Sequence, residues 1–182
     1  MPAAGTSPTT PLLRITVPRR IEASPEEVFD AWAEPDLFRR WLEPHRAILR
    51  KAAVDELWFW EADHAGRLWP HYCRYLRVER PRLLEFTWMS VATRGLESRV
   101  TVEMTPSRGA TDLMLTHNGL PDDEMGRGHE EGWKHFTGIL AEKIKGLRCG
   151  ATGEAVRGEG PGRQGHPKEG EKSDDEAHDR DT

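Results

Sequence analysis

Two histidines of this 182-residue chain fall on apolar faces, where an imidazole could bind a ligand or move a proton. His117 lies on the same side of a predicted strand as Leu113 and Leu115, and His129 lies one turn before Trp133 on a predicted helix. Each could anchor a ligand oxygen or act as a general acid or base, since imidazole titrates near neutral pH. A hydrogen-bonded core histidine is the simpler alternative for both.

Seven tryptophans form the second group of candidates. They bury large areas, either as ordinary core or as the walls of an aromatic ligand pocket. Strand parity puts Trp58 and Trp60 on one side and Leu57 and Phe59 on the other, and both sides are apolar, so parity leaves the inward side open. We predict that a cavity is lined by Trp32, Trp58, Trp60, Tyr72, Trp88, His117, His129, Trp133, Phe136 and Leu140. Further candidates are His71, Tyr75 and Arg19.

Several other chemistries are disfavoured by spacing. The segment 129–135 (HEEGWKH) lacks the histidine pair at i and i+4 of a zinc-protease helix, because position 133 is Trp. Two cysteines, Cys73 and Cys149, are too few for a disulfide framework or a multi-cysteine zinc site, and Cys73 has no evident activating partner. No nucleophile elbow, phosphate loop or dinucleotide fingerprint occurs. We therefore predict neither a metal nor a cofactor.

The elements that must position these residues follow from hydrophobic periodicity. Ser24, Pro25 and Glu27 form a capping box that starts a first helix, and Pro35 starts a second. A stripe from Met125 to Leu147, with steps of three and four, predicts a long helix over 122–147. Strands are predicted over 12–22, 46–51, 56–61, 68–79, 82–89, 97–104 and 111–118. Strands grouped together with helices at the ends indicate an α+β fold.

Composition sets the boundaries and excludes several classes of protein. Residues 150–182 contain five Lys or Arg against nine Asp or Glu, so that most of the net charge of −5 lies there, and no large apolar residue occurs. We expect disordered ends over 1–11 and 149–182 and one folded domain over 12–148. No apolar run is long enough to span a membrane, and no signal peptide is evident. The mild acidity argues against nucleic acid as a partner, and we expect a cytoplasmic protein.

The chain resembles the START-like (SRPBCC, helix-grip) superfamily and, within it, stand-alone bacterial members of the heat-shock-protein-90 ATPase activator homologue family. The matching stretches are RRIEASPEEVFDAWAEPDLFRRWLEP (19–44), YLRVERPRLLEFTW (75–88), ESRVTVEM (97–104), TDLMLTHNGLPDDE (111–124) and HEEGW (129–133). The resemblance implies a curved antiparallel sheet of six to seven strands, two short helices after the first strand, and a long C-terminal helix across the sheet. It also implies a cavity under that helix for an apolar molecule.

Two departures from the family pattern bear on that cavity. Relatives often have Gly-Gly where this chain has Ala52 and Ala53, and often Gly at the position of Cys73. A larger side chain there narrows a cavity or shifts its strand. We expect no counterpart here of the separate N-terminal domain of the eukaryotic activator, so the resemblance gives weaker support for co-chaperone activity than for ligand binding.

Three functions remain open at this stage. The first is binding, without catalysis, of a small hydrophobic molecule that is aromatic or lipid-like. The second is an enzyme of the polyketide cyclase or hydrolase type with His117 or His129 as general acid or base. The third is a chaperone-binding module that uses an exposed sheet surface. A second copy of the chain is a further candidate partner.

Overall fold

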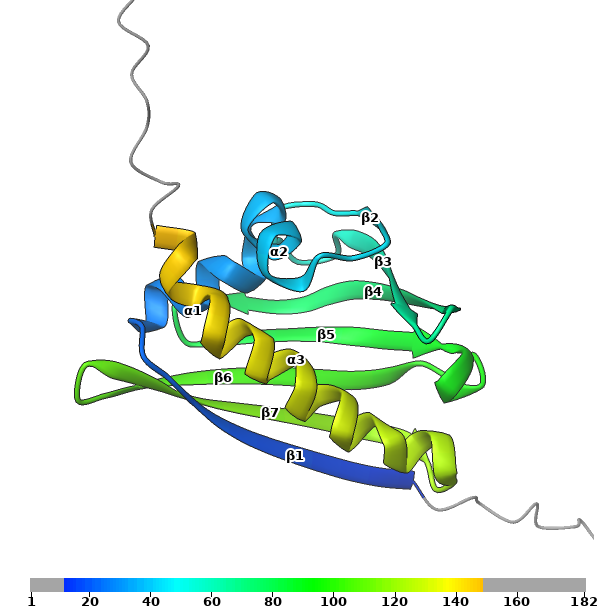
Figure 1. The fold of residues 1–182 in the computed structure, drawn as a ribbon. Helices are drawn as coiled ribbons and strands as arrows, with labels where there is room; N and C mark the ends of the chain where they lie inside the picture. The colour runs from blue at the N-terminus through cyan, green and yellow to red at the C-terminus, as the bar shows by residue number, and fades with distance from the viewer. Residues whose placement is uncertain (1–11, 149–182) are drawn as a thin grey trace, which may run out of the picture. The chain divides into compact units, whose positions relative to one another are not determined.

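Seven antiparallel strands form a single curved sheet in this computed structural model, in the order β1-β7-β6-β5-β4-β3-β2 (Figure 1). The structure describes residues 12–148, so the two predicted disordered ends lie outside the described residues. The strands are β1 (Leu12–Ile21), β2 (Arg46–Ile48), β3 (Leu57–His64), β4 (Arg67–Glu79), β5 (Leu83–Ser90), β6 (Ser98–Ser107) and β7 (Ala110–Pro121). Each strand from β2 to β6 pairs with the next along the chain, while β1 lies at the edge of the sheet beside β7.

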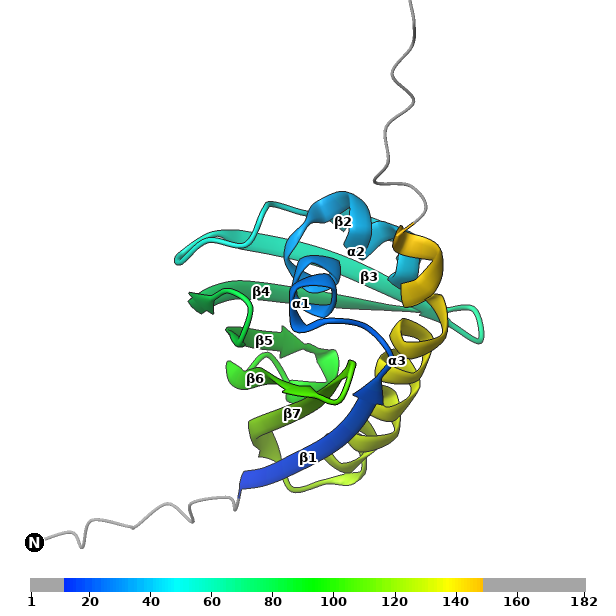
Figure 2. The same ribbon diagram turned by 90° about the vertical axis from the view of Figure 1, so that its left-hand side faces the viewer.

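Three α-helices pack on one face of this sheet: α1 (Pro25–Ala33), α2 (Pro35–Leu42) and α3 (Glu124–Arg148) (Figures 1 and 2). A short 3-10 helix, η1 (Val91–Thr93), joins β5 to β6. The predicted helix-grip α+β architecture is confirmed, with the long helix crossing the sheet diagonally. None of the helices within residues 12–148 has the length and apolar character needed to cross a membrane.

The start of α1 follows the predicted capping box. The Glu27 backbone N–H donates to Ser24 Oγ at 3.3 Å, and the Ser24 backbone N–H donates to Glu27 Oε2 at 2.8 Å. Both interactions satisfy donors that a helix N-terminus leaves unpaired. The cap fixes the direction of α1, whose buried face includes Val28, Phe29 and Trp32.

The start of α3 differs slightly from its prediction. The helix begins at Glu124, two residues later than expected, and Met125 is partly exposed, so the buried stripe begins further along the helix. The first turn lies against the end of β7: a Cβ built at Gly126 would fall 1.8 Å from the Pro121 carbonyl oxygen. Glycine at 126 is therefore required for this close approach, which explains a residue that otherwise disfavours a helix.

Two arginines, one on strand β1 and one on helix α2, hold α3 in place. From β1, Arg19 Nη2 donates to the Lys134 carbonyl at 2.9 Å and Arg19 Nε donates to Thr137 Oγ1 at 3.4 Å. At the far end, Arg40 of α2 donates to the Gly146 carbonyl at 3.0 Å. The last carbonyls of a helix have no partner within it, so Arg40 satisfies one of them.

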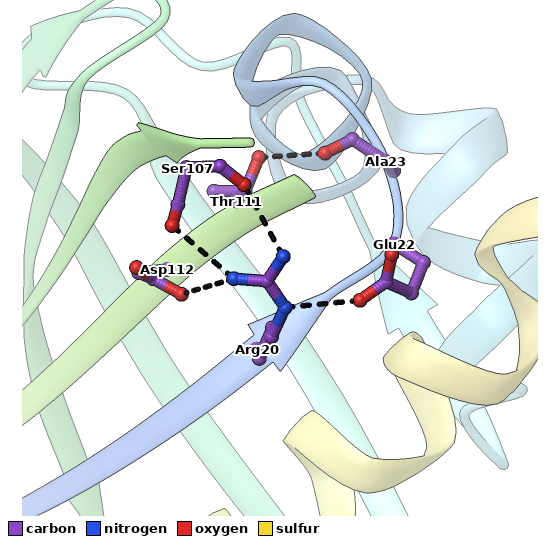
Figure 3. A network of polar contacts seen from close by, with 6 residues as sticks. All are labelled: Arg20, Glu22, Ala23, Ser107, Thr111 and Asp112. Atoms are coloured by element: carbon purple, nitrogen blue, oxygen red, sulfur yellow. Dashed lines mark hydrogen bonds and ion pairs between the residues drawn. The ribbon is translucent and has the colours of Figure 1, made fainter. Parts of the chain in front are cut away.

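A surface network joins the end of β1 to the turn between β6 and β7 (Figure 3). The Arg20 guanidinium donates to Ser107 Oγ at 3.2 Å and forms ion pairs with Glu22 at 3.1 Å and Asp112 at 3.4 Å. These side chains are about half exposed, so each pair stabilises the fold by less than about 1 kcal/mol. The network fixes geometry at this corner more than it adds stability.

Candidate functional site

The space between α3 and strands β3 to β5 is occupied by a cluster of indole rings, here called the aromatic cluster. Its tryptophans are Trp32 from α1, Trp41 from α2, Trp58 and Trp60 from β3, Trp88 from β5 and Trp133 from α3, and all six are buried. The ring centroids of Trp88 and Trp133 lie 4.7 Å apart, and those of Trp60 and Trp88 lie 5.8 Å apart. The side of β3 that strand parity left open is thereby assigned: Trp58 and Trp60 face inward.

The aromatic cluster leaves almost no free volume. The remaining void measures about 10 Å³ and is lined by Trp32, Phe38, Trp41, Leu42, Trp58, Trp60, Trp88, Trp133 and Phe136. A void of that size is at the lower limit for one water molecule. The roomy cavity expected from the long helix is therefore filled, because large rings from both short helices, two strands and α3 converge on it.

Four predicted lining residues do not line this void: Tyr72, His117, His129 and Leu140. Leu140 is fully buried in the core under α3 but does not line the void. The prediction for Tyr72 is wrong: its side chain is 51% exposed and contacts Phe59 on the opposite face of the sheet, with ring centroids 5.1 Å apart. Successive side chains of a strand point to opposite faces, so the inward position beside Tyr72 belongs to His71.

Both ring nitrogens of His117 are engaged. The Trp133 indole N–H donates to His117 Nδ1 at 3.0 Å, which makes Nδ1 an acceptor. In the neutral ring Nε2 then carries the hydrogen and donates to Ser98 Oγ at 2.8 Å, and the Ser98 hydroxyl donates in turn to the Trp88 carbonyl at 2.8 Å. Burial, with smaller contributions from His129 and His71, lowers the pKa of His117 well below its usual value.

The same logic fixes the tautomer of His129. The Trp88 indole N–H donates to His129 Nε2 at 3.3 Å, so that Nδ1 carries the hydrogen and donates to the Met125 carbonyl at 3.0 Å. Burial lowers the pKa of His129, although backbone hydrogen bonds and Asp123 oppose the shift. His117 and His129 therefore act as neutral acceptors for two indoles, and neither has a free lone pair to act as a general base.

His71 is placed differently from these two histidines. Its ring stacks on Trp60 at a centroid distance of 4.3 Å and lies 4.4 Å from the Trp88 ring. Its Nδ1 is buried and has no hydrogen-bond partner. Burial and, secondarily, His129 lower the pKa of His71 to about 3, against a smaller backbone contribution from Trp60, so the ring is neutral at pH 7.

Several indole donors in the aromatic cluster also have no acceptor. The N–H groups of Trp88 and Trp133 bind the two histidines, and that of Trp41 donates to the Ala31 carbonyl at 2.8 Å. The N–H groups of Trp32, Trp58 and Trp60 are buried without any partner. A buried donor that lacks an acceptor costs about 1–3 kcal/mol, so each of these three N–H groups lowers the stability of the folded protein.

Three residues of α2 that the predicted site omitted line the void: Phe38, Trp41 and Leu42. They follow the helix start predicted at Pro35, but nothing in the local pattern showed that α2 reaches across to β3. The Phe38 ring lies 5.5 Å from Trp58 and 6.4 Å from Trp60. Only the tertiary contact reveals them.

A larger depression, of about 450 Å³, lies at the surface between the start of α1 and the β6–β7 turn. Its lining residues are Ser24, Pro25, Glu27, Pro106, Ser107, Arg108, Gly109 and Ala110. The Glu27 carboxylate accepts the cap hydrogen bond, and none of these residues has a buried side-chain atom without a partner. The chemistry of the lining therefore does not indicate a ligand.

Residues 12–148 also give no support for a metal site or a reactive thiol. No group of three or more His, Cys, Asp or Glu side chains among them could hold a metal ion. Cys73 is a buried free thiol, and burial raises its pKa well above the usual value, so it is a poor nucleophile.

Comparison with known proteins places this geometry in a family. The sequence profile described as "Activator of Hsp90 ATPase homolog 1-like protein" matches residues 22–145. The solved structure of protein MLL2253 from Mesorhizobium loti is 28% identical, with a TM-score of 0.63 over 73% of this chain and 97% of that one. No curated protein matches the chain.

Two further solved structures share the fold at lower identity. CalU16 from Micromonospora echinospora is 24% identical, with a TM-score of 0.55 over 74% of this chain and 79% of its own. The Aha1 protein from Colwellia psychrerythraea, solved in solution as a dimer, is 14% identical, with a TM-score of 0.57 over 72% of this chain and 96% of its own. At these identities the comparison bears on the fold alone.

Proposed function

The chain belongs to the Activator of Hsp90 ATPase homolog 1-like family, and from this premise and the geometry above we propose that it binds a small, largely aromatic molecule within the aromatic cluster. The observation that carries the proposal is the set of three buried indole N–H groups, on Trp32, Trp58 and Trp60, that surround the void and have no acceptor. A core built only for stability pairs or omits such donors. A ligand with ring surface and an acceptor atom satisfies them.

Binding requires the aromatic cluster to open, because the void of about 10 Å³ holds no aromatic ring. Phe136 is the lining residue best placed to move, since it lies on α3 and is only partly buried, whereas the lining tryptophans are fully enclosed. Its ring packs against Trp60 at a centroid distance of 5.4 Å. Displacement of Phe136 exposes the indoles beneath it, so we place the entrance on this side.

The experiment titrates the full chain with 1-methylnaphthalene and follows tryptophan fluorescence and heat by calorimetry. Phe136→Ala is expected to bind the probe more tightly than the wild type, because it removes the ring that fills the entrance. Phe59→Ala is the matched control: the same substitution on the outer face of β3 leaves the affinity unchanged. Absence of binding to both the wild type and Phe136→Ala, with both folded, refutes the proposal.

Acid–base catalysis by the two predicted histidines is less well supported than binding. His117 and His129 each donate one ring hydrogen and accept one indole hydrogen, so that neither presents a free nitrogen to a substrate. A general base needs a lone pair within reach of the proton it removes. The binding function therefore takes precedence over the cyclase or hydrolase alternative.

A second candidate function rests on a row of apolar side chains across the outer face of the sheet. Ile48, Phe59, Tyr72 and Met89 are successive register partners on β2, β3, β4 and β5, and three of them are more than one-third exposed. Such a row is a common feature of protein-binding surfaces. Given the family, we propose Hsp90 as its partner.

The test of this second function is a pull-down with the middle domain of Hsp90. The wild-type chain is expected to retain the chaperone domain, and Tyr72→Lys, which places a charge in the middle of the row, is expected to release it. Thr101→Lys on the polar half of the same face is the matched control and binds as the wild type does. Failure of the wild type to retain the domain removes this candidate.

A further inference from the structure

Three buried polar groups stand next to one another on the inner face of the sheet. Trp60 on β3 is the register partner of His71 on β4, and His71 is the register partner of Ser90 on β5. Side chains of directly opposed residues lie on the same face with their Cβ atoms about 4.5–5.5 Å apart. The three residues therefore form one continuous row at the edge of the aromatic cluster.

Each member of this row has unused hydrogen-bonding capacity. The Trp60 N–H and His71 Nδ1 are buried and have no partner, and no acceptor among the described residues takes the Ser90 hydroxyl hydrogen. His71 is 7% exposed, Ser90 5% and Trp60 2%, so bulk water does not satisfy these groups. By contrast, the nearby His117 uses both of its ring nitrogens.

The chemistry of the row defines what could satisfy it. Trp60 supplies a donor only, Ser90 supplies a hydroxyl donor, and His71 Nδ1 accepts when the ring hydrogen is on Nε2. One hydroxyl oxygen matches all three groups: it accepts from Trp60 and Ser90 and donates to His71. The Trp60 ring stacks on His71 at 4.3 Å and the Trp88 ring lies 4.4 Å from it, so a ring that carries this hydroxyl would enter an aromatic environment.

A charged ligand fits the row poorly. The pKa of His71 is set by burial, by His129 and by the backbone of Trp60, and no Lys or Arg contributes to its shift. A carboxylate placed there would be buried without a counter-ion, which is strongly unfavourable. An apolar molecule without oxygen would leave the three polar groups as they are, unsatisfied. The row therefore selects a neutral oxygen function.

We propose that Trp60, His71 and Ser90 form the polar end of the binding site and receive the hydroxyl group of a neutral aromatic alcohol, that is, a phenol or an enol on a ring system. This inference rests on the proposed binding function and specifies the ligand class for it. It moves the polar anchor from His117 and His129, where the sequence placed it, to a row that includes only one histidine.

The experiment compares two probes that differ in one group. 1-Naphthol carries the hydroxyl, and 1-methylnaphthalene carries a methyl group of similar size at the same position. Calorimetric titration of the full wild-type chain is expected to give at least about tenfold tighter binding for 1-naphthol, the effect of gaining buried hydrogen bonds. His71→Phe and Ser90→Ala are each expected to lose this preference while they keep their affinity for 1-methylnaphthalene.

The variants are chosen so that loss of folding is separable from loss of recognition. Ser90→Ala removes only one oxygen atom, and thermal melts show whether each variant is folded. His135→Phe, on the exposed side of α3, is the matched control and keeps the wild-type preference. Equal affinity of the wild type for the two probes, or a preference that survives in folded His71→Phe and Ser90→Ala, overturns the assignment of the row and leaves binding itself intact. Binding of neither probe overturns the binding function as well.

Discussion

The buried neutral histidine at position 71 makes the stability of this protein depend on pH. In the folded chain, burial lowers the pKa of His71 to about 3, whereas an exposed histidine in the unfolded chain has a pKa of about 6.5. Between these values the unfolded chain binds a proton at His71 that the folded chain does not. The free energy of unfolding is therefore highest above pH 6.5 and falls as the pH decreases toward 3.

The size of the effect follows from the linkage relation. Each pH unit below the unfolded pKa costs about 1.4 kcal/mol for a group that stays neutral when folded, so the step from pH 7 to pH 5 removes about 2 kcal/mol through His71. His117 and His129 are shifted in the same direction and add to the loss in the wild type. In His71→Phe these two contributions persist, and the contribution of His71 disappears.

The assay is urea unfolding followed by circular dichroism at pH 7 and pH 5. His71→Phe is expected to lose about 2 kcal/mol less than the wild type between the two values of pH, since phenylalanine does not titrate. His64→Phe, at an exposed position near the end of β3, is the control and follows the wild type. An identical pH dependence in His71→Phe and the wild type would refute the claim that His71 is buried as the neutral form.

Three further variants test other parts of the structure. Ser98→Ala leaves the Nε2 hydrogen of His117 without an acceptor and is expected to lower the free energy of unfolding by about 1–3 kcal/mol in urea, while Ser98→Thr retains it; equal stability of the two contradicts the tautomer assigned here. Arg19→Met removes the donor to the Lys134 carbonyl and is expected to speed amide exchange in the middle of α3; unchanged exchange shows that Arg19 does not hold the helix. Tyr72→Thr is expected to change stability by less than about 0.5 kcal/mol, and a loss typical of the core would place Tyr72 inside after all.

Local patterns were sufficient to predict most of the architecture. The capping box at Ser24, the alternation in β6 and β7 and the stripe of α3 each depend on residues near one another in the chain, and the structure contains all three elements. The predicted strand over 46–51 shortens to β2, three residues long, at the edge of the sheet. A short edge strand has one hydrogen-bonded neighbour, so local sequence defines its ends poorly.

The predicted tryptophans all line the void, whereas Tyr72 lies on the outer face of the sheet. Trp88 and Trp133 follow from inward parity and from the helical stripe, and the structure brings their rings to 4.7 Å. Tyr72 was assigned inward although it alternates with His71, whose inward position follows from the register of β3 with β4. Alternation along a strand shows which face is inward only when one face is apolar and the other is polar. When apolar or aromatic residues occur on both faces, that difference is lost.

The sequence by itself determined the helices and strands, the family and the aromatic character of the interior. Each of these depends on the types of residues that lie near one another in the chain. Only the tertiary structure decided whether the interior is open, which histidine nitrogens are free and which donors lack acceptors. These properties depend on rings from α1, α2, β3, β5 and α3 that meet across separations of up to about a hundred residues. Packing at that range is a property of the assembled fold, since a side chain fills a void or satisfies a donor only when its distant neighbours are in place.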